Sequence, residues 1–457
     1  MKNLNRATSR NIERHAHTGA VARKQVSCHS AANRPSHDTR DRRKPSMGIT
    51  ERNFDVIVAG GGISGSMAAI AAAREGASTL LVERYAALGG MATLGLVQPI
   101  TTWGLGGSYV VAGTGKRMLE EMIQQRPGSA TEMNHYGPSC DAEHLKRLLE
   151  ETALQHGVEL LYHSWITGVE SEGERITGLR TVSKSGEALL RGDVFVDATG
   201  DGDVAAFAGI PADVGSQGIT LMFHVTGIDR ERCPDRTEIA KMYADAGAVN
   251  YRMLAMFWAP QPGSAYMNVT EVEDHDALDV EDLTAATIEC RRQAWAIIDI
   301  LRAEVPGFED AWITQTAPAL GVRESRHVRG LHTLSGDDVE AGRDFEDTIA
   351  RASCPVDIHG SQNEGKGTYH GLKRSYGVPW RSLVTPEYAN LLLTGRCLSA
   401  DTVAHSSVRR MGPGFALGEA AGIGAAQTLA HGDVRDMPIA PLQDRLREFG
   451  AILDPED

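Results

Sequence analysis

Three glycines near the start of the chain have the spacing of a phosphate-binding turn. The sequence reads Gly60-x-Gly62-x-x-Gly65 directly after the apolar, β-branched run 56–58. In such a turn the first glycine permits the bend, the second lets the backbone approach a pyrophosphate, and the third lets helix and strand pack closely. The N-terminus of the following helix adds free N–H groups and a positive dipole end. The spacing therefore predicts a dinucleotide site.

The elements around these glycines complete the motif. An Ala-rich helix follows Gly65, and a second apolar strand, Thr79–Val82, ends at Glu83. A carboxylate at the tip of this strand can accept both ribose hydroxyls of an adenosine. Because strand, helix and acid all stand in the required context, the signal is much more specific than three glycines alone.

Length and composition indicate an enzyme with several folding units. A chain of 457 residues suggests two or three such units. No apolar run approaches the ~20 residues that span a bilayer, so we expect no membrane segment. The six cysteines form no CxxC pair, which argues against a disulfide framework and a zinc or iron–sulfur site. We therefore expect no metal and a cytoplasmic location.

The first 46 residues differ in composition from the rest. They carry 11 Lys or Arg against three Asp or Glu and have no apolar periodicity, which predicts a disordered basic tail. The tail could be an organelle transit peptide, or Met47 could be the true start, and we favour the second reading. Residues 47–457 carry 35 basic and 57 acidic residues, a net charge of −22. Such an acidic surface disfavours nucleic acid and anionic membranes as partners.

Later segments narrow the choice of dinucleotide. A second glycine loop follows Glu83, an apolar strand ends in Ala-Thr-Gly, and a third strand runs into Gly-Arg before a small-residue helix. In order, these segments are Leu88-Gly89-Gly90-Met91-Ala92-Thr93, Ala198-Thr199-Gly200, Gly395-Arg396 and Met411-Gly412-Pro413-Gly414-Phe415. Together they resemble the three FAD signatures of the glutathione-reductase-like flavoproteins, in which the last helix points at the N1/O2 edge of the flavin. Many relatives have Gly-Asp where this chain has Gly395-Arg396.

Within that superfamily the chain resembles the FAD-dependent oxidoreductase family related to fumarate reductase and succinate dehydrogenase flavoproteins. The segments 89–97, 197–209, 321–330 and 391–422 carry the resemblance. It implies an FAD cofactor, non-covalent because the 89–93 loop has no histidine. The residues expected to hold FAD are Gly60, Gly62, Ile63, Ser64, Gly65, Glu83, Arg84, Gly89, Gly90, Met91, Ala92, Thr93, Ala198, Thr199, Gly200, Gly395, Arg396, Gly414 and Phe415.

The same resemblance implies an α/β fold, in which a Rossmann-like FAD-binding domain is interrupted by an α+β substrate domain. After the basic tail we expect the first part of the FAD-binding domain at 47–210 and a substrate or cap domain at 211–384. The FAD-binding domain returns at 385–432, and a C-terminal tail follows at 433–457.

Candidate catalytic residues lie where these parts should meet. His405, Arg409 and Arg410 directly precede the flavin-facing helix, and in fumarate-reductase relatives a His and an Arg in similar places bind substrate carboxylates. Arg323 and Arg326 belong to a family-like RESR segment that could line the same cleft. The alternatives are a salt bridge from the Arg409–Arg410 pair to Asp401 or Glu419, and a buried structural ion network around RESR.

The resemblance favours hydride transfer between a small polar organic substrate and N5 of the flavin. Two alternatives stay open: a flavin monooxygenase that uses external NAD(P)H and oxygen, and a protein with structural or non-redox FAD. The chain has no second GxGxxG unit and no CxxC pair, so we expect the electron donor or acceptor, whose identity is open, to dock transiently. The sequence is also compatible with a homo-oligomer.

Overall fold

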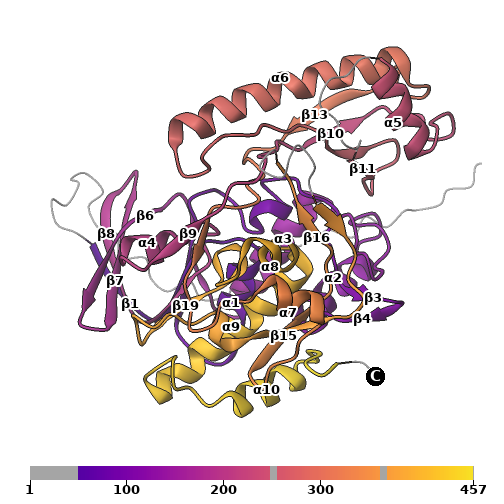
Figure 1. Ribbon diagram of the computed structural model, residues 1–457. Coiled ribbons are helices and arrows are strands. Elements are labelled where there is room, and N and C mark those ends of the chain that lie inside the picture. The colour runs from indigo at the N-terminus through magenta and orange to yellow at the C-terminus, as the bar shows by residue number, and fades with distance from the viewer. Residues whose placement is uncertain (1–49, 247–254, 361–367, 456–457) are drawn as a thin grey trace, which may run out of the picture. The chain divides into compact units, whose positions relative to one another are not determined.

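The glycine motif lies on a large mixed sheet of the computed structural model, which describes residues 50–246, 255–360 and 368–455 (Figure 1). The predicted basic tail lies outside these ranges. The strands of the sheet are β1 (Thr50–Ala59), β2 (Thr79–Val82), β5 (Glu159–Leu161), β6 (Trp165–Glu172), β7 (Arg175–Ser183), β8 (Gly186–Asp197) and β19 (Leu391–Leu393). Their order is β5–β2–β1–β8–β7–β6, with β19 beside the end of β8.

The central strands β5, β2, β1, β8 and β19 are parallel, whereas β6 and β7 form an antiparallel meander on β8. Val56, Ile57 and Val58 of β1 are fully buried, as expected for a parallel strand covered on both faces. Val56 and Val58 pack into one core cluster and Ile57 into another, because successive side chains point to opposite faces. This doubly covered parallel sheet confirms the predicted Rossmann-like α/β class.

Two helices distant in sequence pack against each other beneath the motif. They are α1 (Ile63–Arg74) and α9 (Met411–His431), shown at the centre of Figure 1. A Cβ atom on Gly418 would lie 2.2 Å from the carbonyl oxygen of Ser64, and one on Gly422 would lie 2.2 Å from that of Ala68. The Ser64 hydroxyl also donates to the carbonyl of Gly414, at 2.9 Å. The glycines therefore let the two backbones touch, which brings residues 64 and 414 to one place.

A second, antiparallel sheet lies in the region predicted to bind substrate. Its strands, in the order β11–β12–β10–β13, are β11 (Ala255–Trp258), β12 (Ala265–Asn268), β10 (Phe223–Thr226) and β13 (Trp312–Thr316). The helices α5 (Arg236–Asp245) and α6 (Val280–Glu304) belong to this part and share its apolar cluster. Helix α6 begins at Val280, because the Asp279 carboxylate caps it by accepting from the N–H groups of residues 281 and 282.

Short elements complete the described residues. The helices are α2 (Thr114–Gln125), α3 (Ala142–Gln155), α4 (Asp203–Phe207), α7 (Gly336–Ala341), α8 (Thr402–Val408) and α10 (Ile439–Glu448). The two-stranded ribbons are β3 (Gly104–Leu105) with β4 (Ser108–Tyr109), β9 (Ala212–Val214) with β14 (Arg326–Val328), β15 (Thr348–Ala352) with β18 (Tyr376–Pro379), and β16 (Val356–Ile358) with β17 (Thr368–His370). Among the described residues, no helix is both long and apolar enough to cross a bilayer.

Packing around residue 350 differs from the division expected from sequence. Ile349, Tyr376 and Trp380 fall inside the predicted substrate region, yet they pack into the same apolar cluster as α1 and α9. Helix α10 also buries Leu442 and Leu446 in that cluster, within the stretch expected to be a tail. We therefore propose that the substrate-side part is the four-stranded sheet with α5 and α6.

Candidate active site

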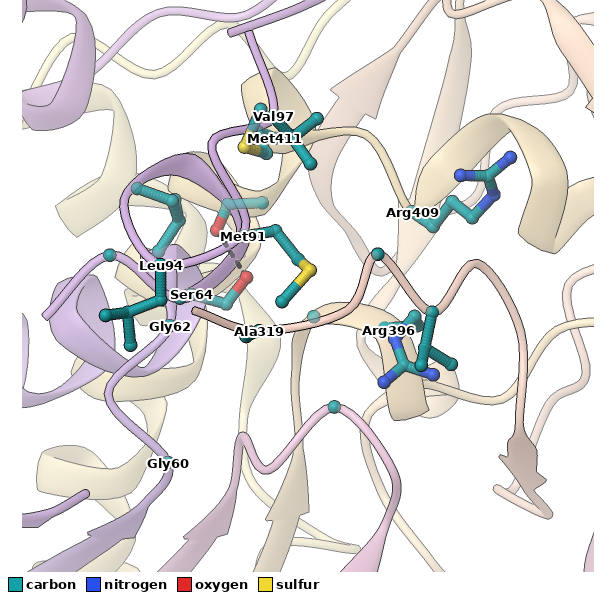
Figure 2. Close-up of a pocket in the computed structure, with 18 of the residues that line it drawn as sticks. Gly60, Gly62, Ser64, Met91, Leu94, Val97, Ala319, Arg396, Arg409 and Met411 are labelled. Carbon is teal, nitrogen blue, oxygen red and sulfur yellow. Dashed lines mark hydrogen bonds between the residues drawn. The ribbon is translucent and has the colours of Figure 1, made fainter. Parts of the chain in front are cut away.

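A large cavity lies beside the C-terminal ends of the parallel strands, with about 1860 Å³ of open space, its mouth included. The predicted cofactor residues that line it are Gly60, Gly62, Ile63, Ser64, Glu83, Arg84, Gly89, Gly90, Met91, Ala198, Thr199, Gly200, Gly395, Arg396 and Gly414. In Figure 2 the Gly60–Gly62 turn and Met91 lie on the left, and the side chains of Arg396 and Arg409 lie on the right. The cavity thus brings all three predicted glycine signatures together.

Four predicted cofactor residues do not line this cavity: Gly65, Ala92, Thr93 and Phe415. A Cβ on Gly65 would lie 1.9 Å from the carbonyl oxygen of Gly60, so this glycine permits the helix to pack. The Thr93 hydroxyl donates to the carbonyl of Leu88 at 2.6 Å and closes the second glycine loop. Ala92 and Phe415 are buried in the core. We propose that these four shape the site without touching the cofactor.

Two helix N-termini at the cavity wall suit an anionic dinucleotide. Helix α1 begins after Gly62 and α9 begins after Arg410, and no side chain caps either N-terminus. A Cβ on Gly62 would meet nothing within 4 Å, so this glycine faces open space. Uncapped N–H groups at a helix N-terminus bind phosphate through hydrogen bonds and the helix dipole.

Glu83 occupies the position expected for a ribose-binding acid. It lines the cavity at the end of β2 and is 7% exposed. One carboxylate oxygen accepts from the N–H of Gly61 at 2.6 Å, and the other accepts from the N–H of Tyr85 at 2.8 Å. Each oxygen retains a second lone pair, which leaves capacity for a pair of hydroxyl donors.

The same end of the cavity contains an aromatic residue that sequence reasoning missed. Trp165, the first residue of β6, lines the cavity and is 50% exposed. The Arg84 guanidinium lies 5.1 Å from the ring centre of Tyr85 and 5.3 Å from that of Trp165. No motif marks a single Trp at the start of a strand, and only the fold brings it next to Glu83.

A carboxyl group that lines the cavity follows the Ala198-Thr199-Gly200 turn in sequence. Asp203 lines the cavity, and burial together with the nearby Asp197 and Asp201 carboxylates raises its pKa to about 6. The predicted catalytic Arg326 is 3.2 Å from the Asp203 carboxylate and donates to the carbonyl of Asp201 at 2.9 Å. Arg326 is not among the lining residues, so here it belongs to the structural ion network that the sequence left open.

The other predicted arginines converge on one carboxylate. Arg323, Arg409 and Arg410 all line the cavity, together with Asp357 and His359. Arg410 pairs directly with the Asp357 carboxylate. Arg409 lies 3.9 Å from the same carboxylate and donates to the backbone carbonyl of Asp357 at 3.0 Å. The alternative salt bridge from the Arg409–Arg410 pair to Asp401 or Glu419 is wrong in its partners, because the pair contacts Asp357. Asp401 caps α8, and Glu419 pairs with Arg74 at 3.0 Å.

Guanidiniums outnumber carboxylates among the lining residues of this cluster. Burial, reinforced by the Arg410 guanidinium, lowers the pKa of Arg409 to about 9, still above neutral pH. Burial likewise lowers the pKa of Arg323, whose guanidinium is 3.6 Å from Glu271. Burial alone would raise the pKa of Asp357, but a hydrogen bond from His359 and the Arg410 charge hold it well below its usual range. Three guanidiniums thus line this part of the cavity beside one lining carboxylate, Asp357, whereas Glu271 and Glu324 act on them from outside the lining.

His405, expected to be catalytic, lies behind the cavity wall. It is fully buried and does not line the cavity. Its Nε2 donates to the carbonyl of Arg396 at 2.8 Å, and burial lowers its pKa well below the usual value. The histidine that reaches the cavity is His359, which sequence reasoning missed because Glu271, one of its two carboxylate neighbours, comes from a distant segment.

The sheet, the glycine turns and the cavity define a Rossmann-like dinucleotide-binding protein. The chain belongs to the FAD-dependent oxidoreductase family, whose profile, described as FAD dependent oxidoreductase, matches residues 55–446. FAD is the cofactor that this family implies, and the uncapped helix N-termini, the open space at Gly62 and the Glu83 carboxylate fit it.

Individual relatives are more distant. Digeranylgeranylglycerophospholipid reductase 2 of Methanococcoides burtonii is 28% identical over 202 residues, 40% of this chain and 47% of the relative. The tRNA uridine 5-carboxymethylaminomethyl modification enzyme MnmG of Chlorobium phaeovibrioides is 28% identical over 159 residues, 32% of this chain and 25% of the relative. These matches thus span less than half the length of either relative. Among solved structures, a geranylgeranyl bacteriochlorophyll reductase-like protein from Thermoplasma acidophilum has a TM-score of 0.47 at 14% identity, covering 87% of this chain and 84% of that one.

Proposed function

We propose that this protein transfers a hydride between a carbon atom of a small, polar, carboxylate-bearing substrate and N5 of FAD. The gathering of three guanidiniums, Arg323, Arg409 and Arg410, beside a single lining carboxylate carries this proposal. A buried cation without a full counter-charge is costly, and a substrate anion would compensate it. Arginine suits a carboxylate because its planar fork can donate two parallel hydrogen bonds.

The substrate-side sheet contributes the facing wall. Phe257 and Asn268 line the cavity from this sheet, and Thr220, just before β10, lines it beside Gly321. The Thr220 hydroxyl lies 2.7 Å from the carbonyl oxygen of Thr270 and 3.1 Å from the Asn268 side-chain oxygen. Polar groups beside one aromatic ring suit a small polar molecule, which the arginines would orient by its carboxylate.

His359 is the residue we propose for proton transfer. Its Nε2 lies 3.0 Å from Asp357 and its Nδ1 lies 3.3 Å from Glu271. A carboxylate beside each ring nitrogen can orient the imidazole. FAD, when bound, supplies N5 as the hydride acceptor or donor. His359 would exchange the proton that accompanies the hydride.

We also propose that electrons enter or leave through a separate molecule, because the sequence contains a single strand–GxGxxG–helix unit. A cytoplasmic location, an absence of nucleic-acid and membrane partners, non-covalent FAD and a possible homo-oligomer also stay proposals. Use of external NAD(P)H and oxygen remains the alternative, and no feature of the cavity specifically favours it.

The first experiment is an absorbance spectrum of the purified protein before and after acid precipitation. A yellow protein that releases FAD into the supernatant is expected, whereas flavin in the pellet would mean covalent attachment. A colourless protein that takes up no added FAD would overturn the proposal. Small carboxylates are then screened anaerobically for bleaching of the flavin. Consumption of NAD(P)H and oxygen that rises with substrate would instead support the monooxygenase.

Carboxylate recognition is tested with Arg409→Gln. Removing one charged donor should raise the dissociation constant of a bound carboxylate by about 10- to 100-fold, read from the perturbation of the flavin spectrum. The control is Arg329→Gln, an exposed arginine that pairs with Asp213 and does not line the cavity. Equal affinities in the two variants would exclude the arginine cluster as the carboxylate site.

A further inference from the structure

A cluster of three chemically reactive side chains lies outside the cavity and has no role in the proposed reaction. It comprises Glu324 and His327 of the RESR region and His405 of α8, with exposed fractions of 2%, 5% and 0%. One ligand atom from each residue lies within 4.8 Å of the other two. The cluster adjoins the cavity wall, because His405 donates to the carbonyl of Arg396.

The atoms that converge in this cluster have no hydrogen-bond partner. They are Oε1 of Glu324, Nε2 of His327 and Nδ1 of His405. Oε1 of Glu324 and Nε2 of His327 are 3.0 Å apart and form an ion-pair contact, but its alignment is too poor for a full hydrogen bond. A buried polar atom without a partner is costly and rare in folded proteins. Three such atoms facing one another indicate a missing common partner.

The protonation of His405 identifies the kind of partner. A carbonyl oxygen can only accept, so the 2.8 Å contact with Arg396 places the proton of His405 on Nε2. Nδ1 then carries a free lone pair directed into the cluster. Metal-binding histidines characteristically donate their second ring N–H to a backbone carbonyl in this way, which fixes the tautomer and the ring orientation.

The spacing of the ligand atoms, though not the present orientation of the rings, suits neighbouring ligands of one ion. The rings of His327 and His405 lie face to face, with centres 4.3 Å apart and planes 25° apart. An imidazole lone pair lies in the plane of its ring, so binding one shared ion requires the His327 ring to turn out of this stacked arrangement, while His405 stays bonded to Arg396. Adjacent ligands at bonds of ~2.0–2.1 Å are separated by about 2.9–3.4 Å, which includes the 3.0 Å between Glu324 and His327.

We propose that Glu324, His327 and His405 bind a divalent transition-metal ion, with Zn²⁺ as the first candidate. Two imidazoles and one carboxylate form a donor set that Zn²⁺ accepts. Gln217 and Thr402 approach the Glu324 carboxylate and would help to orient it. The ion would join β14 to α8 and support the backbone of Arg396 from behind the cavity. Cysteine spacing could not indicate this site, since none of its ligands is a cysteine.

The test is the metal content of protein purified from zinc-supplemented cells and desalted, with FAD measured in the same samples. We expect close to one zinc ion per chain in the wild type and at least ~10-fold less in His327→Gln and Glu324→Gln. The control is His332→Gln, whose ring lies 3.5 Å from Asp338 without a third ligand and which should keep its zinc. Measuring FAD separates loss of metal from loss of cofactor.

A second measurement uses only the wild type, in case the ligand variants fold poorly. After treatment with a chelator, added Zn²⁺ should raise the Tm, and Co²⁺ in its place should produce absorption bands at longer wavelengths than those of the flavin. The proposal is overturned if purified wild type holds no more metal than His327→Gln. A Tm of the stripped protein that does not respond to Zn²⁺ would overturn it as well. Neither outcome bears on FAD binding or hydride transfer.

Discussion

Nε2 of His359 lies 3.0 Å from Oδ1 of Asp357, and both residues line the cavity. The carboxylate therefore connects a histidine to Arg410, which pairs with the same Asp357 side chain. Asp357 lies within β16 and His359 directly follows its last residue, Ile358. The two residues are thus two positions apart, the spacing of side chains on one face of a strand. The arrangement would couple the proposed proton transfer to the part of the cavity proposed to hold a substrate anion.

His359→Gln should reduce kcat by on the order of 100-fold or more, because a positioned general acid or base contributes roughly 10²–10⁴-fold. KM should change much less, because the arginines remain. The measurement is the rate of flavin bleaching by the substrate found in the screen. His224→Gln is the control, since that histidine bonds to Thr314 and does not line the cavity. A His359 variant with wild-type kcat would remove this residue from the mechanism.

Trp165→Ala should weaken FAD binding by about 10-fold, because the half-exposed indole offers a stacking surface beside Glu83 and aromatic–base stacking contributes about 1–3 kcal/mol. The dissociation constant is measured by titrating FAD into the apoprotein. Trp312→Ala is the matched control, an exposed Trp of β13 outside the cavity lining. If both variants bind FAD equally well, Trp165 does not contact the adenine.

Asp203→Asn should stabilise the FAD-free protein increasingly as pH rises. Burial and neighbouring carboxylates raise the Asp203 pKa to about 6, so the folded state holds this proton more tightly than the unfolded state. The wild type therefore loses stability between the unfolded pKa of ~4 and about pH 6, and the asparagine variant avoids this loss. We expect the free energy of unfolding to rise by only about 1 kcal/mol at pH 7, because the Asp203 side chain is 32% exposed and solvent partly screens its charge.

Urea unfolding at several pH values measures this gain. Asp213→Asn is the comparison, because pairing with Arg329 lowers the Asp213 pKa and no gain with pH is expected there. A gain for Asp203→Asn that is the same at pH 4 and pH 7 would mean that the substitution acts by something other than its charge.

Gly418→Ala should lower the free energy of unfolding by about 1–3 kcal/mol, the usual range for overpacking a core. The new Cβ would lie 2.2 Å from the backbone oxygen of Ser64, so α1 and α9 must separate. Urea unfolding measures the change. Gln427→Ala, on the same helix and only half-buried, should stay within about 0.5 kcal/mol of the wild type. Equal stability of the two variants would show that the helix contact tolerates a side chain.

Local patterns were sufficient to predict the cofactor half of the protein. The Gly60–Gly65 turn, the strand ending at Glu83 and the small-residue helix after Arg410 each depend on neighbours in sequence, since turn and helix geometry are set by a few consecutive residues. The fold class and the family are confirmed. Most of the residues expected to hold FAD line one cavity, although Gly65, Ala92, Thr93 and Phe415 do not.

The chemistry of the site depends on contacts between distant segments. His405 and His359 both lie near the Arg409–Arg410 pair in the fold. Packing buries His405 in the core, whereas His359 lines the cavity. Asp357 became the partner of Arg410 because the β16–β17 ribbon packs against α8, a contact that no sequence spacing records.

The sequence by itself therefore determined the class of fold and the position of the glycine turns, because these follow from backbone conformation over short stretches, and its resemblance to known flavoproteins implied FAD. Only the tertiary structure decided which charged side chains reach the cavity, which ones pair with each other, and that Glu324, His327 and His405 converge. The physical reason is that burial and long-range pairing, rather than residue type, control the charge and reach of a side chain.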